Sequence, residues 1–108
     1  MVEGFTYVAA KGATIAVFVD PADVTFVDCR LTLSSSERGG KFYDKTTKAP
    51  DSTWCPTASF KVQGGPGAVE NVIVQETLHY VDPVSGPQTA YDSIWFQVAT
   101  AAYAPPTS

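Results

Sequence analysis

Charged residues are scarce in this sequence. They make up 17% of its 108 residues, compared with about 25% in an average globular domain. The lysines and arginines are scattered, and the densest stretch, residues 37–48, also contains Glu37 and Asp44. A nucleic-acid-binding surface needs cations gathered on one face to neutralise phosphates, and an anionic membrane makes the same demand. With a net charge of −4, we expect neither partner.

Long apolar runs are also missing. No stretch of about 18 apolar residues occurs, so no membrane-inserted helix is predicted. Residues 1–12 lack the basic and apolar segments of a secretory signal peptide. The surface must be rich in uncharged side chains, which is typical of extracellular or particle-associated β proteins. We therefore expect an extracellular or particle-associated (virion) protein. Three explanations fit the missing signal peptide: it was removed from this chain, the protein is exported without one, or the protein stays in the compartment where it is made.

Helical periodicity is absent as well. No window of a dozen residues keeps apolar positions at helical spacing, whereas β-branched and aromatic residues alternate with polar ones between turns. The sequence predicts one all-β domain over residues 1–103 and a proline-rich tail at 104–108. The expected class is an antiparallel β-sandwich of about six to seven strands, with a small β-barrel as the alternative. The expected strands are residues 4–10, 13–19, 24–34, 57–63, 69–81 and 89–102.

The strand at residues 24–34 has the clearest alternation. It predicts that one face, formed by Val27, Cys29, Leu31 and Leu33, points inward. A connection of about 20 residues follows, at 35–54, in which residues 41–45 form at most a short strand. Connections of this length without regular structure are usually functional or mobile, and we expect this one to cross between sheets.

Cysteine and histidine are nearly absent, with only Cys29, Cys55 and His79 present. This small number excludes a four-thiolate zinc site, and the C-x-x-C redox spacing is missing. The two cysteines form a disulfide, remain as buried free thiols, or include a reactive thiol. We favour the disulfide, which closes the long connection, stabilises the fold by roughly 3–4 kcal/mol and presumes an oxidising compartment.

Signs of catalysis are lacking. His79 is alone on a strand, and no Ser-His-Asp order or G-x-S-x-G elbow accompanies it. Asp20 and Asp23 flank a proline and are interpreted as turn formers rather than calcium ligands. We therefore expect no enzyme, no metal and no cofactor, and we place His79 at a surface or an interface.

Three aromatic side chains are candidate contact residues. Tyr91 and Trp95 lie four residues apart on one strand face, about 13 Å apart by the rise of a strand. If exposed, they form a surface on which sugar rings stack. We expect burial of Trp95 instead, because large aromatic side chains are mostly buried. Trp54 packs over the disulfide or anchors a contact.

The last two strands are long, and a tight turn joins them into a hairpin over residues 69–102. Residues 93–102 contain no ionisable side chain and have apolar side chains on both faces. An edge strand of this kind invites pairing with another chain. We therefore predict self-association through the last strand, around Gln97. The alternative is that this strand is central in its sheet and the same chain supplies both neighbours.

These observations predict a non-catalytic β domain that acts through protein contact or self-assembly. It is a surface-exposed or virion structural module, with a homo-oligomer as its main expected state. A carbohydrate-binding module that uses Tyr91, Trp95 and Trp54 is the first alternative. The second is a secreted inhibitor whose connection at residues 35–54 inserts into a protease cleft.

Overall fold

A computed structural model describes residues 3–18, 25–49 and 55–101, and nearly all of its regular structure is β-strand. All six expected strands are confirmed. The elements in chain order are β1 (Glu3–Ala9), β2 (Thr14–Val17), β3 (Thr25–Ser35), the 3-10 helix η1 (Ser36–Arg38), β4 (Gly40–Lys48), β5 (Ala58–Lys61), β6 (Val69–Asp82) and β7 (Gly86–Thr100).

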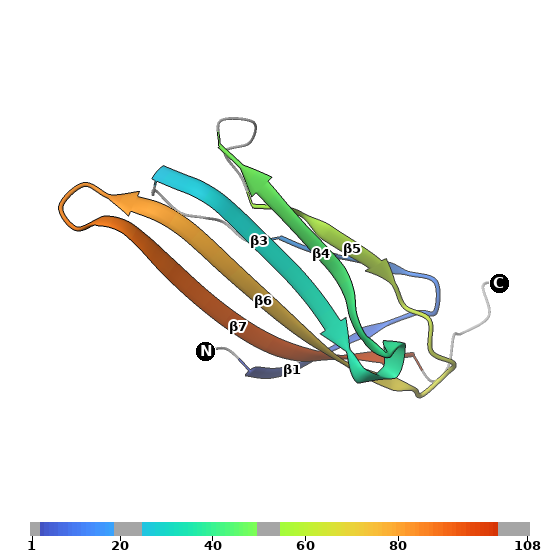
Figure 1. The fold of residues 1–108 in the computed structure, drawn as a ribbon. Coiled ribbons are helices and arrows are strands. Elements are labelled where there is room, and N and C mark those ends of the chain that lie inside the picture. Colours follow the sequence, from blue (N-terminus) through green and yellow to red (C-terminus); the bar gives the residue numbers. More distant parts are fainter. Residues whose placement is uncertain (1–2, 19–24, 50–54, 102–108) are drawn as a thin grey trace.

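The strands form two sheets, which Figure 1 shows as two layers. The larger sheet has the order β1-β7-β6-β3-β4, and the smaller sheet pairs β2 with β5. The predicted sandwich-like all-β fold is confirmed, and the described strands do not close into the alternative barrel. One part of the prediction needs correction. Since β1 runs parallel to β7, whereas the other pairs are antiparallel, the larger sheet is mixed.

The core lies between the two sheets. Alternate residues of β3, β6 and β7 point toward it, as the predicted alternation requires, and β5 covers them from the smaller sheet. The buried cluster consists of Leu31, Leu33, Ala58, Phe60, Val62, Val72, Val74, Phe96 and Val98. We call this side of the larger sheet the inner face and the opposite side the outer face.

Val27 departs from the predicted pattern. It was expected to face inward with Cys29, but its side chain is about half exposed, and Phe26 is buried instead. The pairing of β3 with β6 shifts register between Phe26 and Asp28. A bulge of this kind adds one residue to the strand and so reverses the alternation on one side of it.

The connection at residues 35–54 is the main structural correction. It was expected to be a loop with at most a short strand, but β4 fills nine of its residues and pairs with β3. Gly39 has a φ of +87°, a left-handed conformation that glycine adopts easily, and it returns the chain directly after η1. β4 was not predicted because this edge strand is rich in Lys and Thr and lacks the alternation of apolar and polar residues. Residues 50–54, which include Trp54, lie outside the described residues.

The side chain of Arg38 joins the two sheets. Its Nε and Nη2 atoms contact the Glu70 carboxylate of β6 at 2.5 and 3.1 Å, and Nη2 donates to the Lys61 carbonyl of β5 at 2.7 Å. The guanidinium also lies 4.7 Å from the ring centroid of Phe42 and 5.1 Å from that of Phe60, distances at which cations attract aromatic faces. The ion pair is mostly buried.

On the same side of the sandwich, the Tyr43 hydroxyl of β4 donates to the Thr57 carbonyl at 3.2 Å. The two sheets are therefore fastened to each other where β4 lies above β5. At the opposite side, β1 leaves the larger sheet through a turn closed by the Ala13 amide and the Ala10 carbonyl, 3.0 Å apart. The chain then enters β2 of the smaller sheet.

We expect Arg38→Ala to lower the free energy of unfolding by about 3 kcal/mol, because it leaves the Glu70 carboxylate buried without its cation. Adding Glu70→Gln should recover part of this loss, because the buried charge is removed. Urea denaturation measures both. Arg30→Ala is the matched control, since Arg30 pairs with Asp44 through two contacts of 2.9 and 2.6 Å on the exposed outer face. A loss from the control as large as that from Arg38→Ala would contradict the assignment.

Candidate functional site

The edge of β7 differs from the prediction. One edge of β7 pairs with the whole length of β6. The other edge of β7 is covered by β1, but only from Trp95 to Thr100. The uncharged part that was expected to be open is thus covered by the same chain. Residues 86–94 have no described strand on that edge, and they contain Pro87 and Asp92, which discourage strand pairing.

Gln97 lies within the covered part of β7 and not on a free edge. The Thr6 hydroxyl donates to its Oε1 atom at 3.3 Å, and its Nε2 atom donates to the Asn71 side chain at 3.0 Å. The side chain therefore forms part of a polar row across β1, β7 and β6 on the outer face. This arrangement removes the structural basis for self-association through Gln97.

The edge of β1 that faces away from β7 is the candidate contact site. No described strand pairs with it, and residues 4–9 contain neither a charge nor proline. The outer edge of β4 differs, because that strand carries Lys41, Asp44, Lys45 and Lys48. Charges and proline are the common means of blocking exposed edges. Among the long edges that the structure describes, that of β1 lacks both.

An apolar groove lies beside this edge, between β1 and β2. Its volume is about 350 Å³, and its lining includes Phe5, Tyr7, Ile15, Phe18 and Ile94. The ring of Phe5 stacks on Phe96 with centroids 5.1 Å apart, yet Phe5 is 45% exposed and Tyr7 52% exposed. Large aromatic side chains are usually more deeply buried. The sandwich is thus open along its β1–β2 side.

The outer face holds the predicted aromatic pair. Tyr91 is 62% exposed and Trp95 is 37% exposed, so the expected burial of Trp95 is wrong. The reason is that the smaller sheet covers only the inner face. Tyr91 borders a shallow depression of about 170 Å³ that Arg30, Thr32, Lys41, Gln75 and Thr77 also line. Trp95 lies outside it, directly opposite Ile73 of β6.

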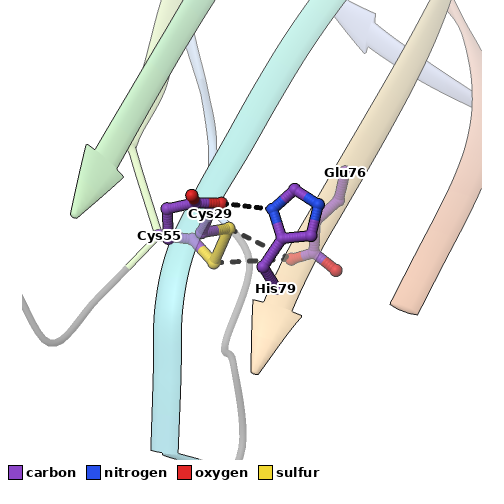
Figure 2. The surroundings of a disulfide bond; sticks show 5 residues. Cys29, Cys55, Glu76 and His79 are labelled. Atoms are coloured by element: carbon purple, nitrogen blue, oxygen red, sulfur yellow. Dashed lines mark hydrogen bonds and ion pairs between the residues drawn. A yellow bond between two sulfur atoms is a disulfide. The ribbon is translucent and has the colours of Figure 1, made fainter. Parts of the chain in front are cut away.

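The two cysteines form the predicted disulfide, which ties β3 to the segment before β5. Both cysteines are buried. Figure 2 shows the carboxylate of Glu76 directed at the sulfur pair, with its Oε2 atom 3.6 Å from Cys55 Sγ and 3.9 Å from Cys29 Sγ. Disulfide sulfurs have no proton, so this contact becomes a hydrogen bond only when the carboxyl is protonated and donates. The Cys29–Cys55 disulfide is compatible with an extracellular location.

Glu76 lies on the inner face, where its surroundings change the pKa of its carboxyl group. Burial raises its pKa, and the charge of Asp92, directly across on β7, raises it further. His79 belongs to the outer face, as predicted, where its Nδ1 atom meets Asp28 at 2.5 Å. The structure therefore does not bring His79 and Glu76 together as an acid–base pair.

Sequence reasoning missed Phe5, Tyr7 and Phe18, although the alternation F-T-Y-V was visible within a strand that it predicted. Trp54, Asp20 and Asp23 lie outside the described residues. Compared with protein-family models, curated proteins and solved structures, the chain has no significant match. In the described ranges, no helix is long and apolar enough to cross a membrane.

We expect Glu76→Gln to raise stability at neutral pH. Because the folded-state pKa of Glu76 lies above its ordinary value of 4.5, the wild-type residue favours folding below that value. This contribution is lost as the pH rises through the raised pKa. Urea midpoints between pH 4 and 8 should therefore show a variant advantage that grows with pH.

The difference between the two proteins isolates Glu76 from the other acids. Glu37, for example, has a lowered pKa because the Asn71 backbone amide donates to its carboxylate at 2.7 Å. Its contribution to the free energy of unfolding therefore decreases as the pH falls, which is the opposite direction. A difference that stays constant across this pH range would contradict the assignment.

Proposed function

We propose that this protein is a non-catalytic β module that binds another polypeptide by adding a strand to β1. One observation carries the proposal. The β1 edge has no charge or proline and borders a groove of exposed aromatic side chains, whereas the edges of β4 and of residues 86–94 are blocked. In strand addition, main-chain hydrogen bonds supply affinity, and pockets for alternate side chains supply specificity.

The backbone of β1 has the hydrogen-bonding groups that such pairing needs. The Ala101 amide donates to the Ala9 carbonyl at 2.9 Å, so the main-chain groups of Ala9 face β7. Successive residues of a strand point these groups to opposite sides. Those of Thr6 and Val8 therefore point away from β7, toward the open edge.

We place this function outside the cell or on a particle such as a virion. The support is the buried disulfide and the scarcity of charged residues. The proposal of a protease inhibitor loses its support, because β4 occupies much of the connection that was expected to insert as a loop.

We expect Val8→Pro to abolish binding of a strand-forming probe and Val8→Ala to preserve it. The probe is a labelled peptide of alternating Val and Thr, as long as β1, measured by fluorescence anisotropy. Proline removes the outward amide of Val8, which takes no part in the ladder with β7, so the fold should tolerate it. Alanine keeps that amide.

The same peptide with every amide N-methylated is the control for main-chain pairing and should not bind. Binding that survives both N-methylation and Val8→Pro would show that the β1 edge is not the site. The same conclusion would follow if the unmodified peptide did not bind at millimolar concentration to protein dilute enough to be monomeric.

A second candidate function is carbohydrate binding on the outer face. It is favoured by the exposed ring of Tyr91 beside a depression that Gln75, Thr77 and Arg30 line. Aromatic rings stack on sugar rings, and neighbouring polar groups bind their hydroxyls. Trp95 supplies a second ring about 13 Å along the same strand.

For this second function we expect Tyr91→Ala to weaken binding of soluble β-linked glucose or N-acetylglucosamine oligosaccharides by tenfold or more. Val84→Ala should have no effect. Val84 is the control because its side chain is exposed but lies in the turn between β6 and β7, away from the depression. Isothermal titration calorimetry measures both variants. Equal effects of the two substitutions, or no heat of binding from the wild type, would remove this candidate.

A further inference from the structure

We infer that the strand added to β1 is β1 of a second copy, paired antiparallel about a two-fold axis at Thr6. This inference rests on the proposed function, because it names the partner of the same edge. The resulting dimer has one continuous sheet in which the two β1 strands are central neighbours. Closed two-fold assemblies of this kind use the same surface patch on both copies.

The direction of the backbone groups decides at which residues an axis through a hydrogen-bonded pair can pass. In an antiparallel hydrogen-bonded pair, two residues directly opposite each other exchange both of their main-chain bonds. Thr6 and Val8 have outward groups, whereas those of Tyr7 face β7 by the same alternation that places Ala9 there. A two-fold axis through a hydrogen-bonded pair therefore passes at Thr6 or Val8. An axis at Tyr7 would pass through a non-hydrogen-bonded pair and place Phe5 opposite Ala9, so that only one aromatic pair would form.

The side chains favour Thr6. With Thr6 opposite its own copy, Phe5 of each chain lies across from Tyr7 of the other, and both residues face the groove. Two cross-strand aromatic pairs then form at non-hydrogen-bonded positions, where side chains approach most closely. An axis at Val8 instead places Phe5 opposite Lys11, within the turn that ends the strand, and forms neither pair.

Charge also favours a second copy in this orientation. The chain has a net charge of −4, which opposes association in general, but residues 4–10 carry no charge. In the sequence, Glu3 precedes this stretch and Lys11 follows it. Antiparallel pairing brings the acidic end of one strand beside the basic end of the other, whereas parallel pairing would bring like charges together. Val8, 65% exposed on the outer face, lies opposite Gly4, which has no side chain to obstruct it.

Cysteine cross-linking tests this register. Under mild oxidation, Thr6→Cys should form a covalent dimer, because directly opposite residues lie about 5.5 Å apart, within the range of a disulfide. Val8→Cys should not, since two copies of that residue would be about 13 Å apart in this register. Non-reducing electrophoresis separates the outcomes. Cross-linking through Val8→Cys but not Thr6→Cys would overturn the register.

Sedimentation and hydrogen exchange of the native chain test the partner without relying on a variant that must fold. At tens of micromolar the wild type should sediment as a dimer, Val8→Ala should do the same, and Val8→Pro should weaken dimerisation by at least tenfold. The amides of Thr6 and Val8 should exchange at least tenfold more slowly in concentrated than in dilute solution.

The outcomes separate this inference from the proposed function. A monomeric wild type whose peptide binding is lost in Val8→Pro would overturn the second copy as partner and leave strand addition in place. A monomer that also fails to bind the peptide would overturn both. A dimer that is insensitive to Val8→Pro would place self-association on another surface and overturn the inference.

Discussion

The contact between the Arg38 guanidinium and its partners in both sheets is the interaction on which the rest of the structure depends. The smaller sheet has only two four-residue strands, and Arg38 attaches it to β6 through Glu70 and to β5 through the Lys61 carbonyl. With the Tyr43 hydroxyl, this contact fastens the sandwich on its β4–β5 side. No comparable polar contact between the sheets is seen among the described residues of the β1–β2 side, and there the sandwich opens into the groove.

Several of the few charged residues of the larger sheet lie along its free strand edges. Lys41, Asp44 and Lys45 lie on β4, at one edge of the larger sheet, and Asp92 lies on the part of β7 that β1 leaves uncovered. The part of β7 that β1 covers, from Trp95 to Thr100, contains no ionisable residue. The edge of β1 has neither protection, and the aromatic side chains beside it are half exposed. In the larger sheet, the described free edges are blocked everywhere except along β1, and this is the arrangement expected of a pairing site.

The sequence predicted all the described strands except β4, and the burial of Cys29, because these depend on local alternation, which β4 lacks. Cys29 was assigned to the core from its neighbours alone, and it is buried there. The position of β7 in its sheet was not accessible in this way, because it depends on a parallel pairing with β1, more than eighty residues earlier in the sequence. Trp95 was expected to be buried because large aromatic side chains usually are, and local alternation does not show which face of the sheet is covered. The short strands β2 and β5 decide which face of the larger sheet is covered, and their position against that sheet does not follow from local alternation.

The groove and the outer-face depression belong to opposite faces of one sheet, and this separation makes the two candidate functions compatible. A two-fold axis between antiparallel strands runs perpendicular to the sheet, so the outer faces of both copies point in the same direction. Pairing at Thr6 then presents two copies of the Tyr91 depression on one surface. Two weak sites held together bind a repeating ligand more tightly than either alone, without any new contact. A shallow, polar depression that would bind one sugar poorly is therefore better suited to a paired form of this protein than to a single chain.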